Sequence, residues 1–152
     1  MLYTIGYESL DASRFVQELR QQNIHVLIDV RELPLSRKRG FSKSALDTLV
    51  TAAGVKYVHL RDLGAPREVR HKLRATGDWD EYCLGYQAHL EQQDVALAAV
   101  AELASEENVC LMCFEADYRE CHRSLIADEL QQQGKIDAPV HLNPQTARRA
   151  VA

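Results

Sequence analysis

Short apolar runs alternate with longer segments in which apolar residues recur at helical spacing, and this pattern predicts a series of strands and helices. The apolar runs predict strands at residues 2–7 (LYTIGY), 25–30 (HVLIDV), 55–60 (VKYVHL), 108–114 (NVCLMCF) and 138–143 (APVHLN). The segments between them predict helices at 11–23, 42–54, 65–78, 79–93, 94–107 and 122–134. Asp11 and Ser42 stand where N-caps are expected, Gly54 where a helix ends, and Gly77 where two helices divide.

The alternation of strand and helix predicts an α/β domain of three layers, with a mostly parallel central sheet flanked by helices. No repeat, low-complexity segment or Pro/Gly/Ser-rich linker divides the chain. We therefore expect a single domain over residues 1–142 and a loosely ordered tail over 143–152. Ligands of such sheets bind where loops leave the carboxyl ends of the strands. Residues 6–8, 29–31, 59–61 and the segment from Cys113 onward are thus expected to converge on one edge.

The composition is that of a globular protein, with 46% hydrophobic and 26% charged residues. No apolar run approaches the roughly 18 residues that a membrane-spanning helix needs. The first residues also lack the basic and apolar regions of a signal peptide. We therefore expect no membrane partner and a cytoplasmic location, where cysteines are more often free, catalytic or metal-bound than paired for structure. The sequence specifies neither a cofactor nor an oligomeric state.

Charge is distributed unevenly along the chain. The formal net charge is −4, yet residues 31–43 (RELPLSRKRGFSK) sum to +4 and residues 61–74 to +3. A basic region on an acidic protein indicates a site for an anion, such as a phosphate, a nucleotide, a nucleic-acid backbone or a sulfur oxyanion. Ser36, Arg37, Gly40 and Lys43 are candidate substrate-binding residues, because Gly40 lets the backbone approach a ligand closely. A solvated basic loop is the equal alternative.

Arg31, His59 and Tyr7 lie at predicted strand ends and are further candidates for substrate binding. Asp29 and Arg31 are two apart in a strand and point the same way, so they form either a buried ion pair or part of the site. His59 ends another strand, either as a second acid–base group or as a structural histidine. Tyr7 follows the first strand and is expected at the same edge.

The segment from Cys113 to Arg123 carries the strongest indication of chemistry. Cys113 is placed at a strand end, while Cys121, His122 and Arg123 open the next helix. A helix N-terminus offers free N–H groups and a positive partial charge, and Arg123 adds a cation, so a thiol there becomes a better nucleophile. Cys121 lies closest to the helix start and Cys113 is the competing nucleophile; the two also form a candidate redox pair. His122 adds a group that titrates near neutral pH, and Glu115 a base or an orienting group for it.

Structural and metal-binding interpretations of the cysteines stay open. Cys110, inside the apolar run, and Cys83, on a helix face, are expected to be structural. Zinc binding by Cys113, Cys121 and an outside residue such as His59 is the weaker alternative. An extended strand turns Cys110 away from Cys113, and residues adjacent in sequence rarely ligate one ion together. We assign no metal ligands from the sequence.

Four separated motifs, TIGYES, DVRELPLSRKRGFSK, YVHLRDLGAP and CFEADYRECHR, resemble in that order the DUF488 family of bacterial and archaeal proteins of unknown function. The resemblance covers nearly the whole chain, from Tyr3 to Leu130, and implies a compact α/β domain. Tyr7 departs from the family pattern, because many relatives have histidine there. The positions that match the family motifs are Arg31, Pro34, Ser36, Arg37, Gly40, Phe41, Lys43, His59, Leu63, Gly64, Cys113, Glu115, Cys121, His122 and Arg123. The family name implies no reaction.

A weaker likeness is to rhodanese-type domains, which carry a persulfide on a cysteine in an anion-binding loop. LIDVRE, followed later by a strand ending in cysteine and a helix carrying arginine, is similar to them. Here the loop after Cys113 is longer and contains Glu115, Asp117 and Glu120, which repel a bound oxyanion unless they point outward. The likeness is therefore an analogy of fold and not of function.

These observations favour an enzyme, a thiol-dependent transferase or hydrolase, that acts on an anionic small molecule or nucleotide. The residues expected to carry the reaction are Cys121, His122, Arg123, Cys113 and Glu115. The alternative is a nucleotide- or nucleic-acid-binding module whose basic loop contacts phosphates and whose cysteines are structural or hold zinc. Few aromatic residues accompany the basic loop, which weighs against stacking on bases.

Overall fold

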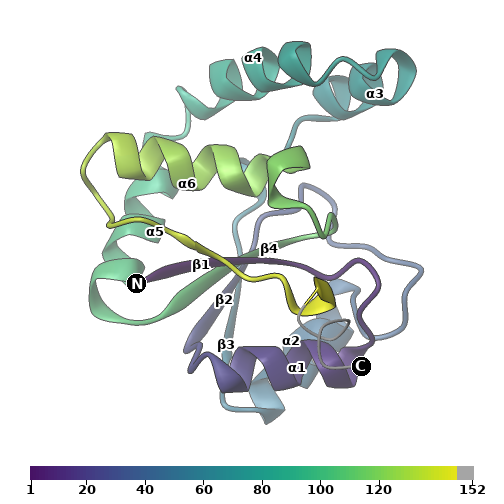
Figure 1. The fold of residues 1–152 in the computed structure, drawn as a ribbon, viewed down its shortest axis with the longest axis vertical. Helices are drawn as coiled ribbons and strands as arrows, with labels where there is room; N and C mark the ends of the chain where they lie inside the picture. The colour runs from purple at the N-terminus through teal and green to yellow at the C-terminus, as the bar shows by residue number, and fades with distance from the viewer. Residues whose placement is uncertain (147–152) are drawn as a thin grey trace.

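The computed structural model of the chain describes residues 1–146. A five-stranded sheet in the order β3-β2-β4-β1-β5 forms its centre (Figure 1). The strands are β1 (Leu2–Gly6), β2 (Val26–Asp29), β3 (Lys56–His59), β4 (Val109–Cys113) and β5 (Val140–His141). The predicted α/β fold is confirmed, and within the described residues every pairing of the sheet is parallel.

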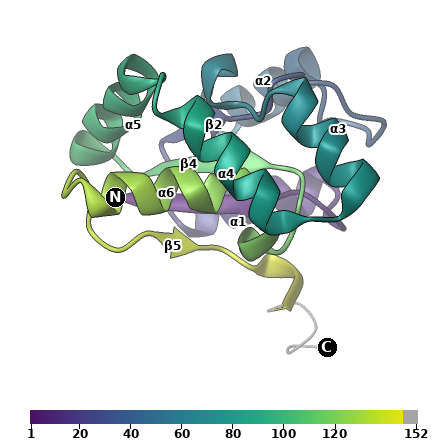
Figure 2. The same cartoon turned by 90° about the horizontal axis from the view of Figure 1, so that it is seen from above.

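Helices cover both faces of this sheet, as the three-layer prediction requires. The helices α1 (Ala12–Gln21) and α2 (Lys43–Ala52) cover one face, and α5 (Asp94–Glu106) and α6 (His122–Gln132) cover the other (Figure 1, Figure 2). Between β3 and α5, the helices α3 (Arg67–Thr76) and α4 (Trp79–Leu90) form a hairpin that packs on the outer side of α6. No helix of residues 1–146 combines the length and the apolar character needed to cross a bilayer.

Alternate residues of the central strands face two separate hydrophobic cores. Leu27, Cys110 and Met112 pack against α1 and α2, whereas Ile28 and Leu111 pack beneath α4, α5 and α6. All five side chains are fully buried. Burial on both faces explains why β2 and β4 are continuous apolar runs rather than alternating ones.

Local sequence signals account for most helix boundaries. Asp11 caps α1 as predicted, since its Oδ1 accepts a hydrogen bond of 2.7 Å from the backbone N–H of Arg14. Gly77 ends α3 with a φ of +70°, which confirms the predicted division. Ser42 occupies the N-cap position of α2, but its side chain makes no capping bond there; it exchanges hydrogen bonds with the backbone of Ser36 instead. The predicted N-cap position of Ser42 is therefore confirmed, although its side chain bonds to Ser36 and not to the first turn of α2.

The register of the strands brings the carboxyl ends together. Gly6 of β1 is paired with Cys113 of β4, while Asp29 of β2 is paired with both Met112 and His59. The convergence expected from the sequence is thus present. Of the predicted tail, residues 147–152 lie outside the described part of the chain.

Candidate active site at the carboxyl edge of the sheet

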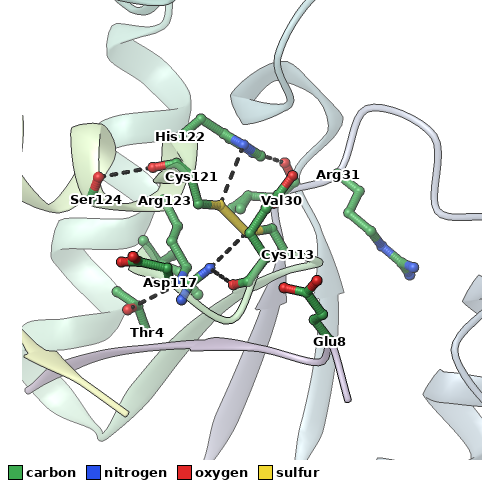
Figure 3. Close-up of a disulfide and its surroundings, with 12 residues drawn as sticks. Thr4, Glu8, Val30, Arg31, Cys113, Asp117, Cys121, His122, Arg123 and Ser124 are labelled. Atoms are coloured by element: carbon green, nitrogen blue, oxygen red, sulfur yellow. Dashed lines mark hydrogen bonds between the residues drawn. A yellow bond between two sulfur atoms is a disulfide. The ribbon is translucent and has the colours of Figure 1, made fainter. Parts of the chain in front are cut away.

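Cys113 and Cys121 form a disulfide at the junction of β4 and α6 (Figure 3). Cys113 is the last residue of β4, and Cys121 is the N-cap of α6, so the strand-loop-helix unit brings two thiols together across eight positions. Both residues are 1% exposed. The candidate redox pair is therefore in bonding contact. Cys110 is buried in the core, as expected, and burial raises the pKa of its thiol.

Arg123 points from α6 beneath the loop and contacts the Cys113 sulfur. Its Nη1 lies 3.1 Å from Cys113 Sγ and also donates to the backbone carbonyl of Glu115 at 2.5 Å. Its Nη2 donates to the carbonyl of Ala116 at 3.2 Å, and its Nε to Thr4 Oγ1 at 3.2 Å. The side chain is fully buried, and burial lowers the pKa of its guanidinium to about 10. The guanidinium therefore stays charged at neutral pH.

That buried cation lacks a carboxylate partner within the part of the chain that the structure describes. The ion pairs closer than 4.0 Å involve Arg14, Arg31, Arg70, Lys72 and Arg119, and none involves Arg123. Its acceptors are two carbonyls, a hydroxyl and a sulfur. A buried charge normally requires an opposite charge nearby. Here the carboxylates of Glu115 and Asp117, which form no ion pair with it, partly offset the effect of burial on the pKa of Arg123.

His122 is buried and neutral. Its Nε2 lies 2.7 Å from the carbonyl oxygen of Val30, and because a carbonyl only accepts, Nε2 carries the hydrogen. Nδ1 then holds a lone pair and lies 3.8 Å from Cys121 Sγ. Burial lowers the pKa of His122 to about 4, despite the hydrogen bond to Val30. The expectation that His122 titrates near neutral pH is therefore wrong: its ring is neutral at pH 7, with the lone pair of Nδ1 unprotonated.

The loop after Cys113 is positioned by the close approach of β1. A β-carbon on Gly6 would come within 3.0 Å of the backbone carbonyl of Glu115, so only glycine fits there. The Glu115 side chain places Oε2 3.6 Å from Cys113 Sγ. Burial raises the pKa of the Glu115 carboxyl, which Arg123 only partly offsets. The Glu115 carboxyl thus lies beside the Cys113 sulfur and holds its proton to a higher pH than an exposed glutamate does.

A cavity of about 500 Å³ opens onto the disulfide. Of the residues selected from the sequence, Tyr7, Arg31, Cys113, Glu115 and His122 line it. Sequence analysis missed several lining residues, which come from the loop after β2 and from the α3–α4 hairpin: Glu32, Leu33, Leu35, Arg70, Arg74 and Tyr82. The only sequence signal for the arginines was the local charge of +3 over residues 61–74.

Arg31 lines the cavity, but its charge is already compensated. Its guanidinium forms a bidentate ion pair with the carboxylate of Asp29, with Nε–Oδ1 and Nη2–Oδ2 distances of 2.9 and 2.7 Å. Its Nη1 also donates a hydrogen bond of 3.2 Å to the hydroxyl of Tyr7. Burial alone would lower the pKa of Arg31, but the hydrogen bonds and charge of Asp29 outweigh it and raise the pKa. The sequence left an ion pair and a site residue as alternatives; the structure contains the ion pair, and a role of Arg31 in substrate binding stays a prediction.

His59 does not line the cavity. Its Nε2 is 2.8 Å from the backbone carbonyl of Arg31, which fits the structural role that the sequence left open.

The basic loop over residues 36–43 follows the cavity-lining Leu35 but does not itself line the cavity. Ser36, Arg37, Gly40 and Lys43 are absent from its lining, and Ser36 is tied into hydrogen bonds within the loop. Lys38 anchors the loop, because its Nζ donates to the carbonyls of Tyr7 and Leu10 at 2.9 and 2.8 Å. Arg37 and Lys43 are exposed. Binding of a substrate by these four residues stays a prediction, and it would not use the lining of this cavity.

The free positive charge of the cavity comes from α3. Arg70 is paired with Glu32 at 2.9 Å, whereas Arg74 is exposed and has no carboxylate within 4.0 Å among the described residues. Three acids, Glu32, Glu115 and Glu120, line the same cavity. The lining is therefore mixed in sign, with Arg74 as its unpaired cation.

Comparison with known proteins places the chain in a family. No curated protein and no solved structure matches it. The family model described as "Domain of unknown function DUF488" matches residues 11–130, a span that includes β2, β4, both cysteines of the disulfide and Arg123. The chain belongs to the DUF488 family.

Proposed function

We propose that the protein is a thiol-dependent enzyme, a transferase or hydrolase, in which Cys113 is the nucleophile and the substrate carries a phosphate or an oxidised sulfur group. The contact between Cys113 Sγ and the guanidinium of Arg123, 3.1 Å apart and buried, carries this proposal. An adjacent cation favours the thiolate over the thiol, and the thiolate is the nucleophilic form. Of the two thiols weighed from the sequence, Cys113 is favoured because Arg123 contacts it and because it lines the cavity.

The surrounding groups fit the steps of a displacement. The Cys113 thiolate attacks phosphorus or sulfur of the substrate and forms a covalent bond, while the leaving group departs with the electron pair of the broken bond. Glu115, whose pKa is raised by burial, donates a proton to that leaving group. Water, or an acceptor molecule in the case of a transferase, then displaces the group from Cys113. Glu115, deprotonated by the first step, takes the proton of that water or acceptor, while Nδ1 of the neutral His122 can accept a hydrogen bond from it.

Substrate charge is recognised by the cavity wall. Arg74 is unpaired and lies in the lining with the Cys113 sulfur, so it can bind an anionic group of a small molecule or nucleotide. The activity needs reduced thiols, which a reducing compartment such as the cytoplasm maintains.

The proposal is tested by the rate of alkylation of each cysteine against pH, on reduced and metal-free protein, read by peptide mass spectrometry. Cys113 should react as a thiolate below the ordinary thiol pKa of about 8.5. Cys83 is the internal control, because it is half-buried on α4 and burial raises its pKa. If Cys113 titrates like Cys83 or above it, the nucleophile assignment is wrong.

A second candidate, phosphate binding by the basic loop, rests on the exposure of Arg37, Arg39 and Lys43 away from the cavity. If the loop binds a nucleic-acid backbone, affinity for a single-stranded oligonucleotide should fall steeply with salt. An Arg37→Gln, Lys43→Gln double variant should flatten that slope. Lys56→Gln is the control and should leave the slope unchanged, because Lys56 is an exposed lysine outside the basic loop, at the start of β3. Absence of salt-dependent binding excludes this candidate.

A further inference from the structure

We propose that the reduced protein binds one Zn²⁺ ion through Cys113, Cys121 and His122, and that this binding reversibly blocks the thiol chemistry. This goes beyond the proposed function, because it assigns a ligand to the same residues in a second state. The two sulfurs and a ring nitrogen of His122 lie within 4.8 Å of one another, and all three residues are buried. Two thiolates and an imidazole are the donor set that zinc prefers among common divalent ions.

A hydrogen bond fixes the orientation of the His122 ring in the way that is common for metal-ligating histidines. Its Nε2–H donates to the carbonyl of Val30 at 2.7 Å, which fixes the tautomer and directs the lone pair of Nδ1 toward Cys121 Sγ (Figure 3). Metal-ligating histidines commonly donate their other N–H to a carbonyl in this way. Residues adjacent in sequence rarely share an ion, but the extended backbone of Cys121 (φ −140°, ψ 142°), followed by the first turn of α6, brings both donors to one side.

Zinc and the disulfide exclude each other. Zn–S bonds of about 2.3 Å in a tetrahedral site hold two thiolate sulfurs about 3.8 Å apart, so the S–S bond must be broken before both can ligate. Breaking it takes two electrons and two protons, which a dithiol supplies by itself and a phosphine supplies together with water, and yields two thiols. Zinc then displaces the two thiol protons on binding. The oxidised and the zinc-bound forms are therefore alternative states of one site.

Three protein donors leave the fourth position of a tetrahedral ion open toward the cavity that Cys113 and His122 line. Two thiolates balance the charge of Zn²⁺, and the imidazole is neutral, so the positive charge of Arg123 remains. An anionic fourth ligand, such as hydroxide or an anionic group of a small molecule, completes the balance. While the ion is bound, neither sulfur is free to act as a nucleophile.

The test measures zinc binding to the full chain in its reduced and oxidised forms, by competition with a chromophoric chelator. The reduced wild type should bind one ion per chain, and Co²⁺ in its place should give a thiolate-to-metal charge-transfer band. Cys121→Ser and His122→Gln should each weaken binding by more than about 100-fold, because each removes a ligand, and loss of a ligand's hydrogen-bond partner alone costs about 10- to 100-fold. Cys83→Ser is the matched control, because Cys83 lies on α4 outside the cluster, and it should bind as the wild type does.

The oxidised wild type keeps the proposal falsifiable if a variant fails to fold, because it has the same sequence and should bind no zinc. Binding that is equal in the two redox forms, or unchanged in both variants, overturns the proposal. Added zinc should also slow alkylation of Cys113 and Cys121 while leaving Cys83 unaffected. Fast thiolate alkylation of Cys113 without zinc binding would remove the zinc site and leave the proposed function standing. If the reduced protein binds zinc but Cys113 of the metal-free protein ionises only at a pH at or above the ordinary thiol pKa, the zinc site stands and the proposed function is wrong.

Discussion

Replacing Arg123 by methionine tests the central claim about Cys113. Methionine fills most of the space of the arginine stem and adds no polar group, so the change removes the guanidinium with the least repacking. In the reduced protein a Cys113 thiolate then lacks the cation now 3.1 Å from its sulfur. We expect the thiol of Cys113 to ionise only at higher pH in this variant.

The contact distance sets the size of the effect. Two unit charges 3.1 Å apart attract each other by about 5 kcal/mol at an effective dielectric constant of about 20. Desolvation of the buried thiolate opposes ionisation in both proteins, so it cancels in the comparison. Since about 1.4 kcal/mol corresponds to one pH unit, a quarter of the Coulomb energy already moves the midpoint of ionisation by roughly one unit.

The assay is alkylation of Cys113 over a range of pH, with the midpoint rather than a single rate as the readout. A less acidic thiol has a more nucleophilic thiolate, so rates at one pH partly hide the shift. Arg119→Met is the matched control, because Arg119 lies in the same loop but is exposed and paired with Asp117. It should leave the midpoint of Cys113 unchanged.

Arg123→Lys separates charge from positioning. A lysine keeps the positive charge but lacks the planar fork that reaches Cys113 and the carbonyls of Glu115 and Ala116 together. If charge lowers the pKa of Cys113, the lysine variant should lie between the wild type and Arg123→Met. A folded Arg123→Met protein whose midpoint equals that of the wild type refutes the reasoning, because the cation would then contribute nothing to the thiolate.

Three further predictions concern the structure around the site. Gly6→Ala forces a β-carbon against the loop backbone and should lower stability by about 3 kcal/mol in urea unfolding, whereas Gly85→Ala, which meets only a valine side chain, should change it by less than about 1 kcal/mol. Asp29→Asn leaves the buried Arg31 guanidinium without its counter-ion and should cost about 3–5 kcal/mol by the same measurement; a loss below about 1 kcal/mol contradicts this ion-pair assignment. Burial lowers the pKa of His141 to about 4, below its unfolded value, so stability should fall as pH drops from about 6.5 toward 4, and His141→Gln should flatten that slope; an unchanged slope argues against this assignment.

The convergence of the strand ends could be predicted from the sequence because it follows from parallel pairing alone. Once β1, β2 and β4 are adjacent and parallel, the residues after Gly6, Asp29 and Cys113 share an edge whatever the side chains do. The candidate nucleophiles and Arg123 were found for the same reason, since one strand-loop-helix unit positions all of them.

The other wall of the cavity could not be predicted, because it depends on where a helical hairpin packs. Arg74 and Tyr82 lie on α3 and α4, and nothing in their local sequence specifies that this hairpin packs against α6 near the carboxyl edge. The basic loop illustrates the converse. A net charge of +4 predicts an anion site, but it does not specify where each basic side chain points. In the structure Lys38 donates hydrogen bonds to backbone carbonyls after β1, which anchors the loop.

The position of Arg123 argues that the site is more than a helix cap. If Arg123 only held the loop in place, it would need only to donate hydrogen bonds to the carbonyls of Glu115 and Ala116. An uncharged side chain can donate such bonds without the cost of burying a cation. Among the groups that contact the Arg123 side chain only Cys113 ionises, and its thiolate would add to the negative charge that Glu115 and Asp117 already place near the guanidinium. The same charge would stabilise a thiolate that attacks a substrate and a thiolate that binds zinc. The proposed thiol reactivity and the proposed metal binding would therefore have one physical origin at this site, and only the occupant of the cavity would differ between them.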